Sequence, residues 1–528
     1  MLRRHNARSD AWPVLMAARK TRRAAGRRVA GGARRLSRRL PDRLRSRAAE
    51  AVARCDPRPA PQAADWSAPL IAGRAVTDPG RSAAGQAADP DSGPDQEAAR
   101  DPAPGLPGAM AARATAVSAA GRPVLRCLIV TGQLDIGGLI AVAAFLARQL
   151  PAYGLATAVL GIRPGPAGAG APAGRLGRLL QADGVEVHET GPDVAPGWIE
   201  RWRPDVISIH GAVPGCVLDA CQRIGVPCVE TLHGMHDLFG ADWQAEAARA
   251  GRLAAITCVS DLVRRQYLAG NPGFPPDRIV TIPNGAAAAA TIRPGYAEAR
   301  RRLGLDGEYL FVSLARHCLQ KNSYGLVTAF GGLARRRPEA HLVIAGRVKD
   351  ARYFRQLTRL TDSLPCRDRI HLRDHAPAPE RLLAAADGFV LNSFFEGWSL
   401  APMEALCAGV PVVISDVGGA REQIAGDPAR GRLVTNPLGD PLRADWDTIA
   451  AARYRAQANE EELTDAMDWL VAGRAGHLAG RDRLAAESAA RFWPDDCAAR
   501  HAVVLRAAAH GGPLPGARAR RLTAGGVA

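Results

Sequence analysis

Residues 388–415 read GFVLNSFFEGWSLAPMEALCAGVPVVIS and contain two apolar runs separated by a loop and a helix-like stretch. The first and last six residues are rich in branched apolar types, which is typical of parallel strands buried on both faces. Between them we expect a helix that begins near Ser399 or Leu400 and ends at Gly409, because glycine readily adopts the left-handed conformation at helix ends. Strand, helix and strand in this order predict a parallel α/β sheet.

Apolar runs of the same kind extend from this unit in both directions, with helix-like stretches between them. An earlier series comprises LRCLIVT (125–131), TAVLGI (157–162), DVISIH (205–210), PCVETL (227–232), AAITCVS (254–260) and RIVTIP (278–283). A later series adds EYLFVSLAR (308–316), HLVIAG (341–346) and RIHLR (369–373) to the opening unit. Two series predict two Rossmann-like α/β domains. Ligands bind such sheets at the carboxyl ends of the strands, so the two domains should face each other across a cleft.

The net charge of +17 is concentrated at the beginning of the chain. Residues 1–58 hold 18 Arg or Lys and four acidic residues, a net charge of +14. Such an arm can bind anionic lipid headgroups, or it can be a disordered tail without a fixed partner, and the sequence favours neither. Nucleic acid is a weaker alternative, because Trp12 is the arm's one stacking aromatic.

Residues 56–120 are rich in Ala, Pro, Gly and Asp and predict a linker that cannot bury enough apolar surface to order itself. Asp89 and Asp91 match a metal-binding D-x-D pattern, but inside such a linker we interpret the match as chance. The ten cysteines are scattered, without a C-x-x-C pair or zinc spacing, and are expected to be small buried residues in a reducing compartment. No run of about 18 apolar residues and no apolar signal core occurs. We therefore expect a cytoplasmic protein, peripheral on the inner face of the membrane if the arm binds lipid.

Two carboxylates flank the beginning of the helix expected in the opening stretch. The first N–H groups of that helix, at Ser399, Leu400 and Ala401, point outward and are suited to a diphosphate. Glu396 lies in the loop before them and Glu404 lies about one turn into the helix, with seven residues between the two. A carboxylate in the loop can accept hydrogen bonds from sugar hydroxyls, and one on the helix can hold a ribose diol.

This segment resembles the retaining glycosyltransferases of family four, which have the two-domain GT-B fold. The paired glutamates stand in E-G-x-S-L-x-P-M-E-A, followed by G-V-P-V-V-x-S-D-V-G-G-x-x-E. The resemblance implies that Glu396 contacts the donor sugar and that Glu404 contacts the nucleotide ribose. It also implies that the backbone of Gly397, Trp398, Ser399 and Leu400 meets the diphosphate.

Arg316 and Lys321 match a second element of the family, an Arg followed five positions later by Lys after the first strand of the second domain. In the family this pair neutralises the departing diphosphate. The chain has three lysines among 69 basic residues, at positions 20, 321 and 349, so an ammonium kept at position 321 suits a phosphate. The alternative is an ordinary exposed lysine.

In the first domain, His210 and His233 end predicted strands and resemble family positions at the cleft, the second near the donor sugar. Either histidine can instead be structural, and His236 follows no pattern. Gly138, in the first glycine loop, is a further candidate donor contact. The family often has Gly-Gly-Ala-Glu where this chain has GGLIAV, Ala315 and Asn322 replace usual glycines, and 441–457 looks like an insertion.

The resemblance covers about 124–510 and predicts a division into five segments. These are a disordered arm and linker (1–120), an acceptor domain (121–288), a donor domain (289–490), a helix that crosses back to the first domain (491–510) and a tail (511–528).

The function implied is transfer of a sugar from a nucleoside diphosphate sugar to an acceptor hydroxyl with retention, without a metal or other cofactor, in polysaccharide, lipopolysaccharide or glycolipid biosynthesis. The acceptor would be a saccharide or a lipid-linked molecule. Alternatives are an inactive sugar-nucleotide binder, a membrane-associated scaffold and a GT-B epimerase.

Overall fold

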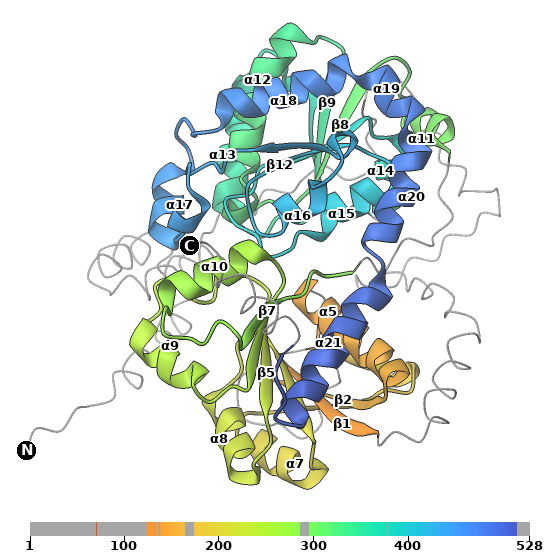
Figure 1. Ribbon diagram of the computed structural model, residues 1–528. Helices are drawn as coiled ribbons and strands as arrows, with labels where there is room; N and C mark the ends of the chain where they lie inside the picture. The colour runs from red at the N-terminus through yellow and green to blue at the C-terminus, as the bar shows by residue number, and fades with distance from the viewer. Residues whose placement is uncertain are drawn as a thin grey trace, which may run out of the picture.

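The computed structural model describes residues 70, 124–132, 134–135, 138–163, 174–285, 295–376 and 378–514. The predicted basic arm, the linker apart from Leu70, and the tail beyond residue 514 lie outside these residues. The described chain forms two α/β domains, one above the other in Figure 1.

The first domain is built on a seven-stranded parallel sheet with the order β3-β2-β1-β4-β5-β6-β7. Its strands are β1 Leu125–Thr131, β2 Leu155–Ile162, β3 Glu186–Thr190, β4 Val206–His210, β5 Cys228–Leu232, β6 Ala255–Cys258 and β7 Ile279–Thr281. Its helices are α5 Gly138–Gln149, α6 Arg175–Ala182, α7 Ala195–Trp202, α8 Gly215–Ile224, α9 Trp243–Ala250 and α10 Asp261–Gly270.

The second domain has a six-stranded sheet, again parallel, with the order β10-β9-β8-β11-β12-β13. Its strands are β8 Tyr309–Leu314, β9 Ala340–Ala345, β10 Ile370–Arg373, β11 Gly388–Leu391, β12 Val412–Ser415 and β13 Gly431–Val434. Its helices are α11 Tyr296–Arg302, α12 Ser323–Arg336, α13 Ala351–Ser363, α14 Pro379–Ala385, α15 Leu400–Cys407, α16 Ala420–Ile424, α17 Trp446–Ala452, α18 Glu460–Ala472, α19 Arg474–Ala479 and α20 Arg481–Arg491. The predicted fold class, two Rossmann-like domains, is confirmed.

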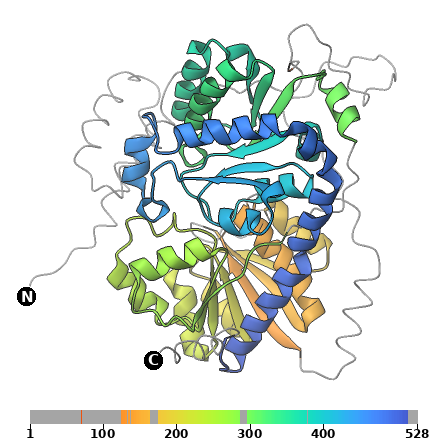
Figure 2. The same cartoon turned by 45° about the horizontal axis from the view of Figure 1, so that its top comes forward.

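The last helix, α21 Pro494–Ala509, leaves the second domain and packs on the first, where it contacts β4, β5 and α5 (Figures 1 and 2). Cys497, Ala502, Val504 and Leu505 belong to the apolar core that includes β1 and α5. Tyr153 anchors the helix further by donating its hydroxyl to the main-chain carbonyl of Asp495 at 3.0 Å. Helix α21 therefore closes the first domain.

Two strands were not among the predicted ones, β3 and β13. Each lies at an edge of its sheet, and β3 (EVHET) is partly exposed along most of its length. An edge strand pairs with one neighbour and is partly exposed to solvent. It therefore lacks the unbroken apolar run from which the central strands were predicted.

The segment predicted as an insertion, 441–457, contains α17. Asp445 begins this helix with a capping box, its side chain accepting from the N–H of Thr448 at 2.7 Å. Trp446 then reaches the first domain and meets Phe239 edge-to-face at 5.6 Å between ring centroids. No helix among the described residues is long and apolar enough to cross a membrane.

Candidate active site

The predicted helix in the opening stretch is α15, and it lies where the two domains meet. It spans Leu400–Cys407 with Ser399 as its N-cap, and Gly409 follows it with a φ of 72° in the left-handed region. The loop before it starts at the carboxyl end of β11, so the first N–H groups of α15 face the cleft. A helix of two turns with this orientation favours a bound anion at its N-terminus.

Gly397 brings this loop against the first domain. A Cβ atom at this position would lie 1.7 Å from the carbonyl oxygen of His233, far inside any permitted contact. Gly418 and Gly419 make similarly close approaches, because a Cβ would lie 2.1 Å from the Gly397 oxygen in one case and from the Trp398 ring in the other. Because these residues have no side chain, the loop at Gly397 can lie directly between His233 on one side and Gly418 and Gly419 on the other.

Glu396 and Lys321 form a buried ion pair at the same place. The Nζ of Lys321 lies 2.6 Å from Oε1 of Glu396, and their side chains are only 12% and 8% exposed. Ser393 donates its hydroxyl to the same carboxylate oxygen at 2.6 Å. Residues 75 positions apart in the sequence are thus joined directly, and the alternative of an ordinary exposed lysine is wrong.

Arg316 lies after β8 and is more exposed than Lys321. Its Nη2 donates to Oε1 of Gln320 at 3.1 Å, and Gln320 in turn donates to the main-chain carbonyl of Phe395 at 3.2 Å. The guanidinium is therefore linked to the loop of Glu396 through one side chain. It remains available to a charged ligand in the cleft.

Asn322 explains one departure from the family pattern. Its φ is 49°, in the left-handed region where the family has glycine, and asparagine tolerates this conformation better than most residues. Its side chain also begins α12 by accepting from the N–H of Gly325 at 3.4 Å. The loop shape beside Lys321 is thereby kept without glycine.

Glu404 lies one turn into α15, and its carboxylate has no hydrogen-bond or charged partner of opposite sign among the described residues. Burial raises the pKa of this carboxyl, and the charge of Glu380 raises it further. A half-buried carboxylate without a partner has an unfilled capacity to accept hydrogen bonds. A diol at the cleft would supply the missing donors.

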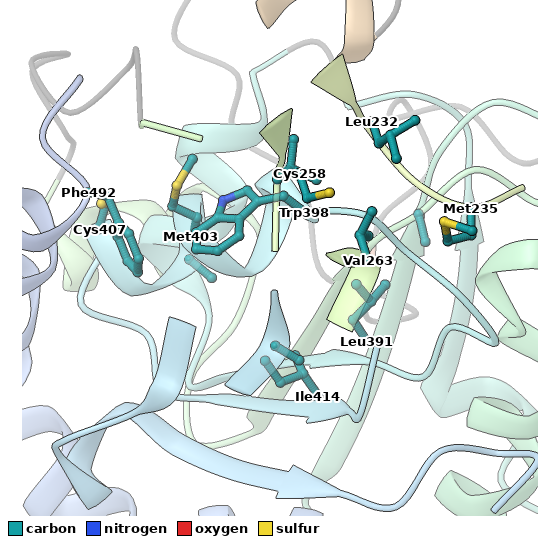
Figure 3. Close-up of a cluster of buried hydrophobic side chains, with 14 of the residues drawn as sticks. Leu232, Met235, Cys258, Val263, Leu391, Trp398, Met403, Cys407, Ile414 and Phe492 are labelled. Atoms are coloured by element: carbon teal, nitrogen blue, oxygen red, sulfur yellow. The ribbon is translucent and has the colours of Figure 1, made fainter. Parts of the chain in front are cut away.

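The side chain of Trp398 belongs to the apolar core. Its side chain lies among Met403, Cys258 and Phe492 (Figure 3), and it meets the Phe492 ring edge-to-face at 6.4 Å. Only its backbone is placed to meet a ligand at the helix terminus. At Ser399 the carbonyl accepts from Nε2 of Gln423 at 2.7 Å, and the hydroxyl makes no capping bond to the helix.

The two predicted histidines meet below the cleft. His210 Nδ1 lies 2.9 Å from His233 Nε2, and Ser208 Oγ lies 3.0 Å from His210 Nε2. Burial lowers the pKa of His210 well below its usual range and that of His233 to about 3, so both rings are neutral at physiological pH.

A third histidine, His501 on α21, completes this buried group and was not predicted. Its side chain is 2% exposed, and its proximity contributes to lowering the pKa of both other histidines. Burial lowers its own pKa to about 4. A single histidine on an apolar helix face carries no signal of such a role in the sequence, although the helix itself was expected to reach this domain.

Gly138 and His236 are the remaining first-domain positions, and Glu422 belongs to α16 of the second domain. Gly138 begins α5 at the carboxyl side of β1, and no atom lies within 4 Å of where its side chain would begin. His236, for which no pattern was found, is exposed and stacks on Phe395 at 5.8 Å. Glu422, at the end of the family motif, accepts from the main-chain N–H of Asp261 at 2.7 Å and so ties α16 to α10 of the other domain.

Two family models match adjacent parts of the chain and together cover more than half of it. Residues 136–289 match "Glycosyltransferase Family 4", and residues 296–443 match "Glycosyl transferases group 1". The chain is 28% identical over 312 residues to glycogen synthase of Mycobacterium tuberculosis, covering 56% of this chain and 71% of that protein. It is 32% identical over 284 residues to the D-inositol 3-phosphate glycosyltransferase of Pseudarthrobacter chlorophenolicus. This match covers 49% of this chain and 65% of that protein.

The lipopolysaccharide core biosynthesis mannosyltransferase LpsB of Rhizobium meliloti is 32% identical over 160 residues, which are 29% of this chain and 44% of that enzyme. Among solved structures, a glycosyltransferase from Rickettsia africae superposes with a TM-score of 0.58 at 15% identity, over 73% of this chain and 98% of that one. HepE of Anabaena, solved in complex with UDP, also superposes with a TM-score of 0.58 at 16% identity. The superposition covers 72% of this chain and 100% of HepE. These structures share the fold, and the predicted GT-B arrangement is confirmed.

Proposed function

Because the chain belongs to glycosyltransferase family four, we propose that it moves a sugar from a nucleoside diphosphate sugar to an acceptor hydroxyl with retention of the anomeric configuration. The observation that carries this proposal is the buried Lys321–Glu396 pair beside the N-terminus of α15, with Glu404 one turn further along the helix. A cation, a set of free N–H groups and two carboxylates are the groups that a diphosphate, a sugar and a ribose require.

The donor would lie along α15 in an order fixed by these groups. Its diphosphate would meet the N–H groups of Ser399 and Leu400 and the positive charges of Lys321 and Arg316. Its ribose diol would donate to the unpartnered carboxylate of Glu404. Lys321 would share its charge between the diphosphate and Glu396, with which it is already paired.

Glu396 and His233 would hold the sugar. The Glu396 carboxylate accepts from Lys321 and Ser393 through one oxygen, and its other oxygen lies 3.4 Å from Gln320 Nε2, a long contact that a sugar hydroxyl can replace. His233 directly follows β5, and its carbonyl oxygen lies against Gly397, so in this proposal its ring approaches the sugar from the first domain.

In the reaction, the bond between the anomeric carbon and the diphosphate oxygen breaks while a bond from the acceptor oxygen forms on the same face. The proton of the acceptor hydroxyl passes to the departing phosphate oxygen. Lys321, Arg316 and the α15 N-terminus stabilise the negative charge that develops on the diphosphate. Much of the remaining rate comes from holding the acceptor hydroxyl beside the leaving phosphate, on the same face of the sugar. We propose that these groups suffice without a metal.

Relatives suggest the pathway and the donor class. Their names refer to glycogen, inositol phosphate and lipopolysaccharide core, and HepE was solved with UDP and with UDP-glucose. We propose an acceptor that is a saccharide or a lipid-linked molecule of polysaccharide, lipopolysaccharide or glycolipid synthesis. A cytoplasmic enzyme whose residues 1–58 contact an anionic membrane would fit such an acceptor.

The test is a thermal-shift and hydrolysis screen of the full chain with UDP-, GDP- and ADP-sugars, with and without EDTA. A donor that binds the folded state raises the melting temperature. We expect one base to do so, slow hydrolysis of that donor in the presence of EDTA, and loss of hydrolysis in Lys321→Ala but not in Lys349→Ala, since Lys349 is an exposed lysine. Stabilisation without turnover on any acceptor would favour the inactive binder, and no response to any donor would favour the scaffold alternative.

A further inference from the structure

A cavity of about 150 Å³ lies at the hinge between the two domains, behind the loop that carries Glu396. We call it the hinge cavity. It is lined by residues 283–285 of the interdomain linker, by Trp398 and Glu422, and by residues between 491 and 500, where α20 gives way to α21. None of Lys321, Glu396 and Glu404 lines it, so it is separate from the proposed donor site.

Two residues that line the hinge cavity carry polar atoms that are buried without a hydrogen-bond partner among the described residues. They are Oδ1 of Asn284 and Nε1 of Trp398, on side chains of residues that are each 7% exposed. One is an acceptor and the other is a donor. Buried polar groups are nearly always hydrogen-bonded in native proteins, so this pair indicates an occupant that can both donate and accept.

The charged groups of the same wall already have partners. Arg500 Nε lies 3.0 Å from Asp496 Oδ2, and Arg491 donates to the main-chain carbonyl of Glu422. The Glu422 carboxylate accepts from the N–H of Asp261 at 2.7 Å. The lining has two arginines and two carboxylates, so its formal charges cancel, and its buried atoms without a partner are a neutral donor and a neutral acceptor. This chemistry suits hydroxyl groups better than an ion.

The size and the apolar part of the wall narrow the class of occupant. The volume is that of roughly five water molecules at ~30 Å³ each, which is close to the size of one sugar ring. Phe492, Trp493 and Pro283 present apolar surface there, against which water would lose hydrogen bonds. A pyranose has hydroxyls at its rim and C–H groups on its faces, so it can satisfy both kinds of surface at once.

We propose that the hinge cavity is a second sugar site, which binds one pyranose unit or a similar neutral polyol outside the donor cleft. Asn284 accepts from one of its hydroxyls, and the indole N–H of Trp398 donates to another. Trp493, which is 53% exposed, lies at the rim, where it can stack on the ring.

The experiment measures binding of free D-glucose, D-galactose, D-mannose and myo-inositol to the full chain by ligand-detected NMR, with UDP at saturating concentration to fill the donor site. We expect at least one of them to bind, and we expect Asn284→Leu and Trp398→Phe each to weaken it about tenfold or more. Trp398→Phe removes the indole N–H and keeps an aromatic ring, which protects the core around it. Glu396→Gln is the matched control and should leave this affinity unchanged, because Glu396 does not line the cavity.

Several results would overturn the proposal. Absence of binding by all four compounds would mean that the cavity holds only water. A loss of affinity in Glu396→Gln that both hinge variants lack would assign the sugar to the cleft. Tighter binding of inorganic phosphate than of any sugar in the same assay would assign the cavity to an anion.

Discussion

The ammonium of Lys321 and the carboxylate of Glu396 lie 2.6 Å apart, so the cation proposed for the diphosphate is neutralised by the acid proposed for the sugar. A donor entering the cleft must share this lysine or take it from Glu396. The pair therefore keeps two buried charges compensated until the donor arrives, when the diphosphate becomes a second partner of the lysine.

Lys321→Ala should lower turnover by roughly 10²-fold or more, because it removes positive charge from the transition state. It should also lower the melting temperature, since it leaves the 8%-exposed Glu396 carboxylate unpaired. Steady-state kinetics and thermal unfolding check both effects, with Lys349→Ala as the control. Wild-type turnover in Lys321→Ala would refute the role assigned to this residue.

Arg316→Ala should also lower turnover, but with little change in melting temperature, because Arg316 is exposed.

Glu396→Gln should separate binding from catalysis. Without the carboxylate, Lys321 is free for the diphosphate, so we expect UDP to bind at least as tightly as to the wild type while transfer slows. Calorimetric titration with UDP and the rate of transfer measure the two quantities. An unchanged rate would contradict the proposed contact with the sugar.

Glu404→Gln should stabilise the protein and weaken nucleotide binding. Burial raises the pKa of Glu404 in the folded state, so its contribution to stability is present at low pH and is lost as pH rises through the raised value. The variant should therefore gain melting temperature at pH 7.5 and gain little near pH 4.5. Its Kd for UDP should rise about tenfold, as expected for loss of a hydrogen bond to a charged group. Glu461→Gln is the control, because Glu461 is exposed. An unchanged affinity for UDP in Glu404→Gln would exclude the ribose contact.

The three buried histidines should make the protein sensitive to mild acid. His210, His233 and His501 have lowered pKa values, about 3 for His233 and about 4 for His501, whereas the unfolded chain takes up protons near pH 6.5. The free energy of unfolding should fall as pH drops below about 6.5, by up to about 1.4 kcal/mol per pH unit for each histidine.

His501→Phe tests this origin of the acid sensitivity, because it should reduce the slope between pH 7.5 and 5.5. Denaturant unfolding at several pH values gives the slope. His510→Phe, an exposed histidine just after the same helix, should leave it unchanged. Equal slopes in all three proteins would show that the acid sensitivity arises elsewhere.

Gly397→Ala should abolish most activity, because its Cβ would lie 1.7 Å from the His233 carbonyl oxygen. Either the loop of Glu396 or the first domain has to shift, and a displacement of this size is enough to cost about 10²-fold in rate. Gly476→Ala is the control, since no atom lies within 4 Å of a Cβ there. Near-normal kinetics in Gly397→Ala would mean that the cleft is more open in solution.

Trp446→Ala should weaken closure of the cleft. The ring contacts Phe239 of the first domain at 5.6 Å and Phe395, the neighbour of Glu396, at 5.4 Å. Each such pair contributes about 0.5–1.5 kcal/mol, so the KM for the donor should rise about three- to tenfold with a small change in melting temperature. Leu442→Ala, an exposed residue of the same insertion, is the control, and a matching rise in its KM would show that the effect is not specific to the ring.

The sequence predicted the central strands and α15, because buried parallel strands leave unbroken apolar runs and helix ends leave glycine and an N-cap. It also identified Lys321 and Glu396, but as contacts to different parts of a donor. Their direct pairing spans 75 residues and depends on how β8 and β11 neighbour each other, which no local pattern encodes. His501 and the Trp446 contact were missed for a similar reason, since each matters only through what lies opposite it in the other domain.

Helix α21 has a consequence for how the protein is made. His210 ends β4 and His233 directly follows β5, so both leave the ribosome before α21, which carries His501 and is synthesised after every strand of both sheets. The histidine pair of the first domain therefore stays uncovered until α21 has been synthesised. Truncation before residue 494 would leave the first domain without α21. A cut in the linker at 283–285 would instead separate the two domains, so that each lacks a surface that the other supplies.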